Sequence, residues 1–406
     1  MNNWLKHNYL WLSLLATFAG FAAAPLYRHI FTIFAITGLY LLIKQRKTII
    51  HSTQIRHFSI LFVCLWIPMA ISLVDAEFLN RSLSTTLRFL GYLFAAISII
   101  HLARQQSMDK LLMGCYGVML FLSLDGLLQW LTGTNILGYP AYRDLRIVGM
   151  FFPEPYLSLF LATFSPLFLE ASRQLQQRFN YAWLGFLPFI AIIVLGGSRT
   201  AWMLFAIAFI VYGIYFLQIQ KKINWRRLAL QSSGVAIALA IAISQSSYIQ
   251  TRIELASGLF SGDYQQANQA TSARLPLWQT AIKMTEENWF NGVGPRAFTL
   301  SYDQYSDTND YWHNRPTGQP HLYILEISSE TGLVGVIGYL TLLALLLARL
   351  WKLSRQGAHP AIPWGIAALI AGFPLGAAMP IFGYFAAQLF WFPLIIFFAL
   401  QSNTSR

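Results

Sequence analysis

Long apolar runs, each near the length needed to cross a bilayer, recur along the whole chain. A helix needs about 20 predominantly apolar residues to span the hydrocarbon core. These runs carry few charges: only 11% of the 406 residues are charged, against about 25% in soluble domains. Because backbone polar groups in hydrocarbon must be satisfied within the chain, such runs form helices. The sequence therefore predicts an all-α polytopic membrane protein.

We expect about twelve transmembrane helices and one large loop. The expected spans are roughly 9–27, 29–43, 57–74, 83–102, 111–131, 154–171, 180–196, 200–219, 229–247, 331–349, 361–379 and 381–400. They divide the chain into residues 1–247 with helices 1–9 and short loops, a loop domain at 248–330 that contains short helices, and residues 331–406 with helices 10–12. A shorter segment at about 132–153 is also long enough to carry a site.

The distribution of basic residues predicts the orientation in the membrane. Lysines concentrate in alternate loops, which places both termini in the cytoplasm and the large loop on the opposite side. That opposite side has one lysine, Lys283, and many arginines: Arg28, Arg81, Arg143, Arg146, Arg199, Arg252, Arg274, Arg296 and Arg315. Since guanidinium binds phosphate and carboxylate bidentately, this bias favours an anionic ligand there, although scarce extracytoplasmic lysine explains it as well.

His321 is the candidate general base. It follows Pro320 and precedes a helix that we expect to begin near Leu322 and to continue into the tenth span. Near neutral pH an imidazole accepts a proton from a hydroxyl, although the pattern by itself favours a solvated or capping histidine. Glu326 and Glu330 follow in the same helix; Glu330 lies too far along it to contact His321, so both are expected to pair with arginines of the loop.

The candidate substrate-binding residues are arginines. Arg199 lies in the turn "GGSRTAW" at a membrane boundary, Arg274 precedes an expected amphipathic helix within 271–289, and Arg296 follows the Gly-rich turn "NGVGP". Arg88, inside the fourth span, is the fourth candidate, and we expect it to form an ion pair or to share a polar cavity with Asp125 at the same depth, because intramembrane charges are costly unless paired.

We expect no metal site and no cofactor. The sequence has no HExxH, Walker, GxSxG or DxD motif. One cluster of acidic residues could suggest a cation site: Asp303, Asp307 and Asp310. These residues lie in a tyrosine-rich loop without a recognisable ligand spacing. Aromatic residues outside the spans suit sugar faces but are individually more typical of packing: Tyr139, Tyr142, Trp278, Trp289, Tyr302 and Tyr305.

Three stretches taken together resemble the O-antigen ligase family, which includes O-antigen polymerases and related bacterial oligosaccharyltransferases. They are "GGSRTAWMLF", "ARLPLWQTAIKMTEENWFNGVGPRAF" and "HLYILEISSETGLVGVIGY", in that order over roughly 190–345. The resemblance implies a GT-C-like, metal-independent glycosyltransferase of the bacterial inner membrane. Its donor would be a glycan on undecaprenyl diphosphate, bound at the periplasmic face. The family's motif arginines correspond to Arg199 and Arg274 and its histidine to His321, while Leu322 replaces a frequent asparagine.

The resemblance favours an O-antigen ligase, with lipid A-core as acceptor, over a polymerase that extends another lipid-linked glycan. The short tail "QSNTSR" disfavours a protein-glycosylating member. A transporter or flippase of lipid-linked glycan is the alternative from a different class, because the stretch "AGFPLGAAMP" is typical of a broken transporter helix. A glycolipid-binding protein without catalytic activity is a further alternative. Nucleic acid is not an expected partner, since the net charge of +12 comes largely from the cytoplasmic loops.

Overall fold

The fold was taken from a computed structural model, which describes residues 3–23, 29, 31–142, 146–220, 225–245, 247–258, 262–376 and 379–403. Arg28 and Arg143 lie outside the described residues. This part of the chain is helical and contains no β-strand; two isolated bridges, between Thr134 and Pro140 and between Tyr142 and Arg146, shape the segment after α6. The all-α prediction is confirmed for it.

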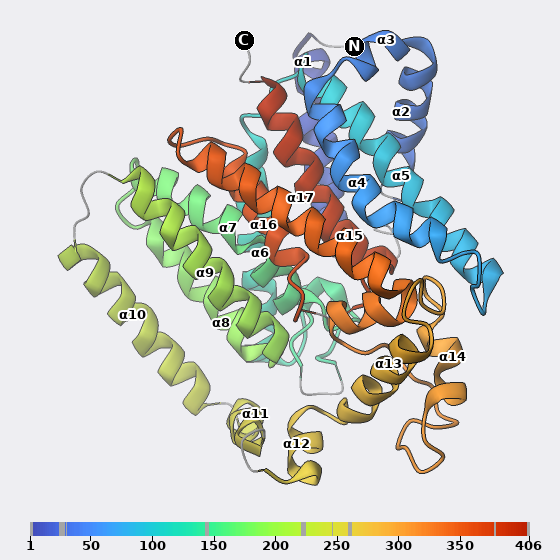
Figure 1. Ribbon diagram of the computed structural model, residues 1–406. Coiled ribbons are helices and arrows are strands. Elements are labelled where there is room, and N and C mark those ends of the chain that lie inside the picture. Colours follow the sequence, from blue (N-terminus) through green and yellow to red (C-terminus); the bar gives the residue numbers. More distant parts are fainter. Residues whose placement is uncertain are drawn as a thin grey trace.

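The helices follow one another with short connections before and after one long interruption (Figure 1). They are α1 (Asn3–Gly20), α2 (Thr32–Lys44), α3 (Arg46–Ile50), α4 (Thr53–Ile71), α5 (Leu79–Ala103), α6 (Leu111–Thr132), η2 (Gly149–Phe151), α7 (Leu157–Gln176), η3 (Ala182–Gly185), α8 (Phe186–Leu195), α9 (Arg199–Ile219), α10 (Trp225–Ser244), α11 (Ser247–Ser257), α12 (Tyr264–Ala270), α13 (Leu275–Glu287), α14 (Phe298–Tyr305), α15 (Tyr323–Ser354), α16 (Ile362–Ala371) and α17 (Tyr384–Asn403).

Six of the described helices are long and apolar enough to cross a membrane. They are α4, α5, α6, α9, α15 and α17. The other six expected spans also fall on helices, namely α1, α2, α7, α8, α10 and α16, but three of these, α2, α8 and α16, are only 10 to 13 residues long. The chain is therefore a helical protein with the features of a membrane protein, and twelve spans remain a prediction.

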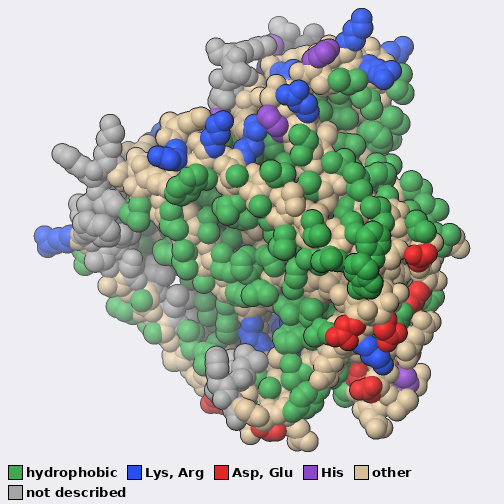
Figure 2. Space-filling view, in the orientation of Figure 1, with side chains coloured by type: hydrophobic (Ala, Val, Ile, Leu, Met, Phe, Trp, Pro, Cys, Tyr) green, Lys and Arg blue, Asp and Glu red, His purple; other side chains and the backbone are tan. Residues whose placement is uncertain are grey.

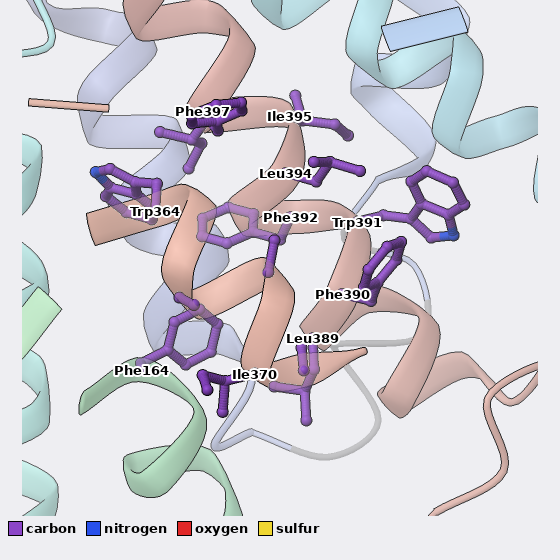
Figure 3. Close-up of a cluster of buried hydrophobic side chains, with 14 of the residues drawn as sticks. Phe164, Trp364, Ile370, Leu389, Phe390, Trp391, Phe392, Leu394, Ile395 and Phe397 are labelled. Atoms are coloured by element: carbon purple, nitrogen blue, oxygen red, sulfur yellow. The ribbon is translucent and has the colours of Figure 1, made fainter. Parts of the chain in front are cut away.

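The core lies where α7, α16 and α17 pack together. Every residue of α7 from Leu157 to Ser172 is buried, and α17 is apolar on all sides, as expected of a helix surrounded by others. Figure 3 shows aromatic side chains of the three helices filling this centre, with Phe392 of α17 beside Trp364 of α16, their ring centroids 6.0 Å apart. Outer helices such as α9 instead expose apolar side chains, including Phe209, Ile210 and Ile214.

Charge is segregated along the long direction of the bundle. Helix α1 begins and α17 ends at one edge, while α12, α13 and α14 cover the opposite edge (Figure 1). In the same orientation, Lys and Arg side chains gather at the first edge, hydrophobic side chains cover the middle, and Asp and Glu lie toward the second edge (Figure 2). An apolar belt between two polar rims is the pattern of a bilayer-embedded protein.

Candidate functional site

The turn that carries Arg199 is built as its sequence predicts. Gly197 has φ +63°, and a Cβ on Gly196 would lie 1.7 Å from Oγ of Ser158, so this reversal requires glycine. Ser198 then caps α9 by accepting the N–H of Ala201 at 3.3 Å. Arg199 is the first residue of α9 and is thereby held at the helix end that faces the large loop.

Arg199 binds the turn that precedes Arg274. Its guanidinium donates to the carbonyl oxygen of Ala270 and, at 2.7 Å, to Oγ of Ser272. Ser272 and Ala273 adopt φ of +61° and +58°, a conformation that non-glycine residues rarely hold unless the surroundings stabilise it. Arg274 follows at the N-cap of α13. The structure thus brings Arg199 close to the backbone that orients Arg274.

Helix α13 packs on the bundle through one face and connects Arg274 with His321. Leu277 and Met284 are buried in a small cluster with Phe298 and Tyr302 of α14. The amphipathic helix expected within 271–289 is confirmed, but its N-cap is Arg274, with no side-chain cap, because Thr271 and Ser272 belong to the preceding turn. One turn into the helix, the indole of Trp278 donates to the carbonyl oxygen of Pro320 at 2.7 Å.

His321 lies directly before α15, as predicted, with Leu322 as the N-cap. Its backbone is left-handed, with φ +56°, and the Trp278–Pro320 bond holds the residue before it. The side-chain amide of Gln319 contacts Nδ1 of the imidazole at 3.3 Å. His321 is half-buried and lines an open cavity of about 580 Å³.

The cavity at His321 is basic. Arg81 of α5 and Arg296 line it together with His321, and its other polar walls come from Thr299, Thr317 and Gln319. Among the described residues that line the cavity, none is Asp or Glu. Such a cavity is electrostatically suited to a phosphate-bearing ligand. Of the sequence-predicted residues, the structure therefore brings His321 and Arg296 together, whereas Arg199, Arg274 and Arg88 do not line this cavity.

Arg296 is positioned by Glu330. The Glu330 carboxylate accepts the backbone N–H of Arg296 at 2.6 Å and that of Phe298 at 3.2 Å, and so satisfies the start of α14. Arg296 has φ +66°. Glu326 and Glu330 were both expected to pair with arginines of the loop. Glu330 instead accepts the backbone N–H of Arg296, and Glu326 accepts the N–H of Ile381.

A break in α15 makes room for the Gly-rich turn. Gly332 has φ +62° and ψ −163°, which interrupts the helix. The carbonyls of Ser329 and Glu330 accept the N–H groups of Val293 and Gly294, both at 2.9 Å, and the N–H groups of Leu333 and Val334 donate to Trp289 and Phe290. The segment 289–294 thus supplies the hydrogen bonds that the interrupted helix lacks. The sequence predicted one continuous helix here, and that prediction was wrong.

Arg88 supports a wall of the cavity. Its guanidinium donates to the carbonyl oxygen of Phe382 and lies 3.8 Å from the centre of the Tyr384 ring. Glu326 holds the same segment, since its Oε2 accepts the N–H of Ile381 at 3.1 Å. Pro380, directly before this segment, lines the cavity. Arg88 therefore contributes to the cavity indirectly, by holding the backbone that follows Pro380.

The predicted Arg88–Asp125 ion pair was wrong. Asp125 accepts the N–H of Ile136 at 2.9 Å, and one turn later Gln129 accepts the N–H groups of Val148 and Gly149 and donates to the carbonyl oxygen of Tyr139. Residues 136–139 and 148–149 lie against α6 and are held by these two side chains. A carboxylate that receives backbone N–H groups does not need an arginine at the same depth.

The aspartates Asp303 and Asp310 accept hydrogen bonds from other residues of the loop. Asp310 accepts the Tyr302 hydroxyl and, at 2.8 Å, the N–H of Trp312. Asp303 accepts the N–H of Asn314 at 2.9 Å and lies 3.8 Å from Nδ1 of His313. In the part of the chain that the structure describes, groups of three or more His, Cys, Asp or Glu side chains with the placement of metal ligands are absent.

Sequence reasoning missed two residues of the site. Arg81 was noted only as one of many arginines on its side, because nothing in the chain around α5 links it to His321, which is 240 residues away. Glu330 was noted for its charge but not for its role at Arg296. The signal for it was the Glu-x-Gly pattern at 330–332, in which the glycine breaks the helix and the carboxylate meets the inserted segment.

The Glu330→Gln variant is expected to lower the stability of the fold. An amide presents one acceptor oxygen where two N–H groups, of Arg296 and Phe298, need acceptors. Leaving one buried N–H unsatisfied costs about 1–3 kcal/mol. Thermal unfolding of the purified protein in detergent, followed by tryptophan fluorescence, measures the loss. Glu286→Gln, at an exposed position of α13, is the matched control; an equal midpoint for both variants would contradict the role of Glu330.

Comparison with known proteins now adds to this geometry. The family model described as O-antigen ligase matches residues 184–340. The match begins before Arg199 and includes Arg274, Arg296, His321 and Glu330. A search of curated proteins finds no match. The resemblance noted from the sequence is confirmed over this range.

Proposed function

We propose, from the premise that this chain belongs to the O-antigen ligase family over residues 184–340, that it is the O-antigen ligase of its cell. The family acts on lipid-linked glycan, with ligase or polymerase activity. The proposed reaction transfers the glycan from undecaprenyl diphosphate to a sugar hydroxyl of lipid A-core in the synthesis of lipopolysaccharide. The observation that carries the proposal is the open cavity that His321 lines together with Arg81 and Arg296.

The arginines would stabilise the leaving diphosphate. Undecaprenyl diphosphate is already a good leaving group, and fixed cationic donors lower the energy of the charge that develops as the glycosidic bond breaks. Arg81 and Arg296 supply such donors in the cavity. Arg274, which does not line it, is proposed as a further donor-binding residue on the family resemblance alone. With this charge provided by guanidinium groups, the proposed reaction needs neither a metal ion nor another cofactor.

His321 would be the general base. The acceptor hydroxyl loses its proton to the imidazole, its oxygen forms a bond with the anomeric carbon, and the bond from that carbon to the diphosphate oxygen breaks. The side-chain nitrogen of Gln319 donates to Nδ1 at 3.3 Å and so orients the imidazole in the cavity. A single displacement of this kind inverts the anomeric configuration.

The proposed location is the bacterial inner membrane with the site at the periplasmic face. Lys and Arg gather at the edge where α1 begins and α17 ends, whereas the cavity is lined from the opposite side by residues of the large loop (Figure 2). Under the positive-inside rule, the first edge faces the cytoplasm. Both termini are then cytoplasmic, and residues 248–330 are periplasmic.

The test of this function is a transfer assay with purified protein, undecaprenyl diphosphate-linked glycan and lipid A-core, in the presence of EDTA. A ligase produces glycan on lipid A-core, and a product with inverted anomeric configuration supports the single displacement. Longer lipid-linked glycan without core product would identify a polymerase instead. Glycan moving across a vesicle membrane with neither product would identify a transporter.

The Arg274→Lys variant is expected to bind donor more weakly. Lysine keeps the charge but loses the planar pair of donors that fits a phosphate, so the donor KM should rise roughly tenfold, corresponding to about 1.4 kcal/mol. Arg274→Ala should raise the donor KM further. Arg199→Ala should also raise it, because Arg199 holds the turn before Arg274. Steady-state kinetics with varied donor measure this. Arg355→Lys, at an exposed arginine that lines neither described cavity, is the control; a rescue to wild-type KM by lysine at 274 would contradict bidentate binding.

A further inference from the structure

A second cavity, of about 370 Å³, lies on the other side of α13 from Trp278 and shares no lining residue with the cavity at His321. One of its walls is a face of α13 formed by Pro276, Gln279, Thr280 and Lys283. These positions are three, four and seven residues apart, which is the spacing of one helix face. Gln279 and Lys283 of this face are exposed, whereas Pro276 and Thr280 are buried, so the two exposed polar side chains are available for a ligand.

Three tyrosines line this second cavity. Tyr264 of α12 and Tyr311, in the loop after α14, lie at its rim and are 49% and 53% exposed; the Arg315 guanidinium lies over the Tyr311 ring, 4.5 Å from its centre. Tyr305, at the end of α14, accepts a hydrogen bond from Asn288 at 2.9 Å and donates to the carboxylate of Glu77. Burial and the bond to Glu77 raise the pKa of Tyr305 to about 12, so its hydroxyl stays protonated.

The polar groups of the second cavity are amides and carboxylates held in place by the loop. The Tyr264 hydroxyl donates to Oε1 of Gln279 at 3.3 Å, and Oδ1 of Asn268 accepts the N–H of Leu275 at 3.3 Å. Asp310 is fixed by the Tyr302 hydroxyl and the N–H of Trp312. Each carboxylate or amide oxygen accepts more than one hydrogen bond, so these groups retain capacity for ligand hydroxyls.

The charge of the second cavity differs from that of the first. Its lining has one lysine, Lys283, and two aspartates, Asp307 and Asp310, whereas the cavity at His321 has two arginines and no lining carboxylate among the described residues. Carboxylates disfavour a phosphate, and the many polar groups disfavour an acyl chain. Flat apolar rings beside fixed hydrogen-bonding groups instead match an uncharged sugar, which has apolar C–H faces and a rim of hydroxyls.

We propose that the second cavity is a saccharide-binding site that holds sugar residues of the glycan at a distance from the reacting diphosphate. The inference rests on the proposed function, and it assigns the substrate's sugar chain to Tyr264, Tyr305, Tyr311 and the polar face of α13. Because it binds sugars away from the bond that reacts, the site contributes to glycan selection and affinity and does not take part in the chemical step.

Helix α14 connects the two cavities. Thr299 and Leu300 near its start line the cavity at His321, and Tyr305 at its end lines the second one. Five to six residues of helix are roughly 8–9 Å long, since the rise is about 1.5 Å per residue. A short oligosaccharide covers such a distance, so a glycan whose first sugar lies beside His321 is able to reach the tyrosines.

The test measures binding of lipid-free glycan to the full-length protein in nanodiscs. Two probes distinguish the source of the sugar: the host's O-polysaccharide and its core oligosaccharide, each released from lipopolysaccharide by mild acid. Saturation-transfer NMR and titration calorimetry follow binding to wild type, to Tyr264→Ala/Tyr311→Ala, and to Tyr181→Ala, an exposed tyrosine that does not line either cavity, as the matched control.

We expect the double variant to bind one of the probes roughly tenfold more weakly, or about 1.4 kcal/mol, because two rings that would cover sugar faces are lost. Tyr181→Ala should bind as wild type does. Gln279→Ala should also weaken binding. Because Gln279 is an exposed helix position, this variant tests the site even if the double variant misfolds. Failure of wild type to bind either probe, or equal binding by the double variant, would overturn the site.

The same preparations are also assayed for transfer, which separates this inference from the proposed function. Transfer to lipid A-core without any tyrosine-dependent glycan binding would overturn the saccharide site alone. Tyrosine-dependent binding in a protein that transfers nothing would support the site and count against the ligase proposal. In an active protein, the double variant should raise KM for long glycans while kcat stays near its wild-type value.

Discussion

The His321→Ala variant is expected to lose glycan transfer by about 10²–10⁴-fold while it still binds donor. That range is the usual contribution of a positioned general base, and His321 is the one imidazole that lines the basic cavity within the described residues. Donor affinity should change little because Arg81 and Arg296 stay in place. Single-turnover transfer, together with donor binding measured on the same preparation, checks both parts of the prediction.

The other loop histidine provides the matched control. His313 hydrogen-bonds to Oγ of Ser306 through Nδ1 at 2.8 Å and does not line the cavity at His321. His313→Ala should therefore retain transfer within a few-fold of wild type, whatever its effect on the loop. If His321→Ala turned over normally, the imidazole would have no part in the reaction. If both variants lost transfer equally, the loop fold and not a general base would explain the loss.

The Gly332→Ala variant is expected to destabilise the protein by about 3 kcal/mol or more. A residue with φ +62° and ψ −163° is in a region that is essentially restricted to glycine, which alone costs about 1–3 kcal/mol. In addition, a Cβ there would lie 2.3 Å from the carbonyl carbon and oxygen of Phe290. The inserted segment 289–294 would have to move, and Arg296, which follows it, would move with it.

Thermal unfolding in detergent, followed by tryptophan fluorescence, measures this effect. Gly91→Ala is the control, because Gly91 lies within α5 and a Cβ there meets nothing within 4 Å. That substitution should leave the midpoint unchanged or raise it slightly, as alanine favours helix by up to about 1 kcal/mol. Equal midpoints for Gly332→Ala and wild type would mean that the break in α15 is not required by the fold.

Much of the helical framework was predictable because apolar runs and their flanking signals are local. Each of the twelve expected spans overlaps a helix, although 180–196 covers both η3 and α8 and 9–27 runs past the end of α1, and the "GGSR" turn before α9 forms as its two glycines and its capping serine indicate. The limits of α7, α8 and α16 were less accurate. Residues before α7 and after α16 are apolar like the helices themselves, so composition does not mark where the backbone leaves the helix.

The pairings of buried polar groups were not predictable in the same way. Depth along two spans suggested Arg88 with Asp125, but each found backbone partners from another part of the chain: Phe382 for Arg88 and Ile136 for Asp125. Backbone N–H and C=O groups are present in every segment, so the sequence does not identify which of them satisfies a given side chain. That choice depends on how non-helical segments pack against the bundle.

The sequence by itself determined the helical class, the order of the helices, the position of His321 before α15 and the family resemblance that residues 184–340 confirm. These follow from local hydrophobicity and short motifs. Only the tertiary structure decided that Arg81 joins His321 and Arg296, and that the turn at 289–294 enters the break at Gly332. The physical reason is that these contacts join segments far apart in the chain, and their energies depend on backbone groups that become neighbours only after the bundle has packed.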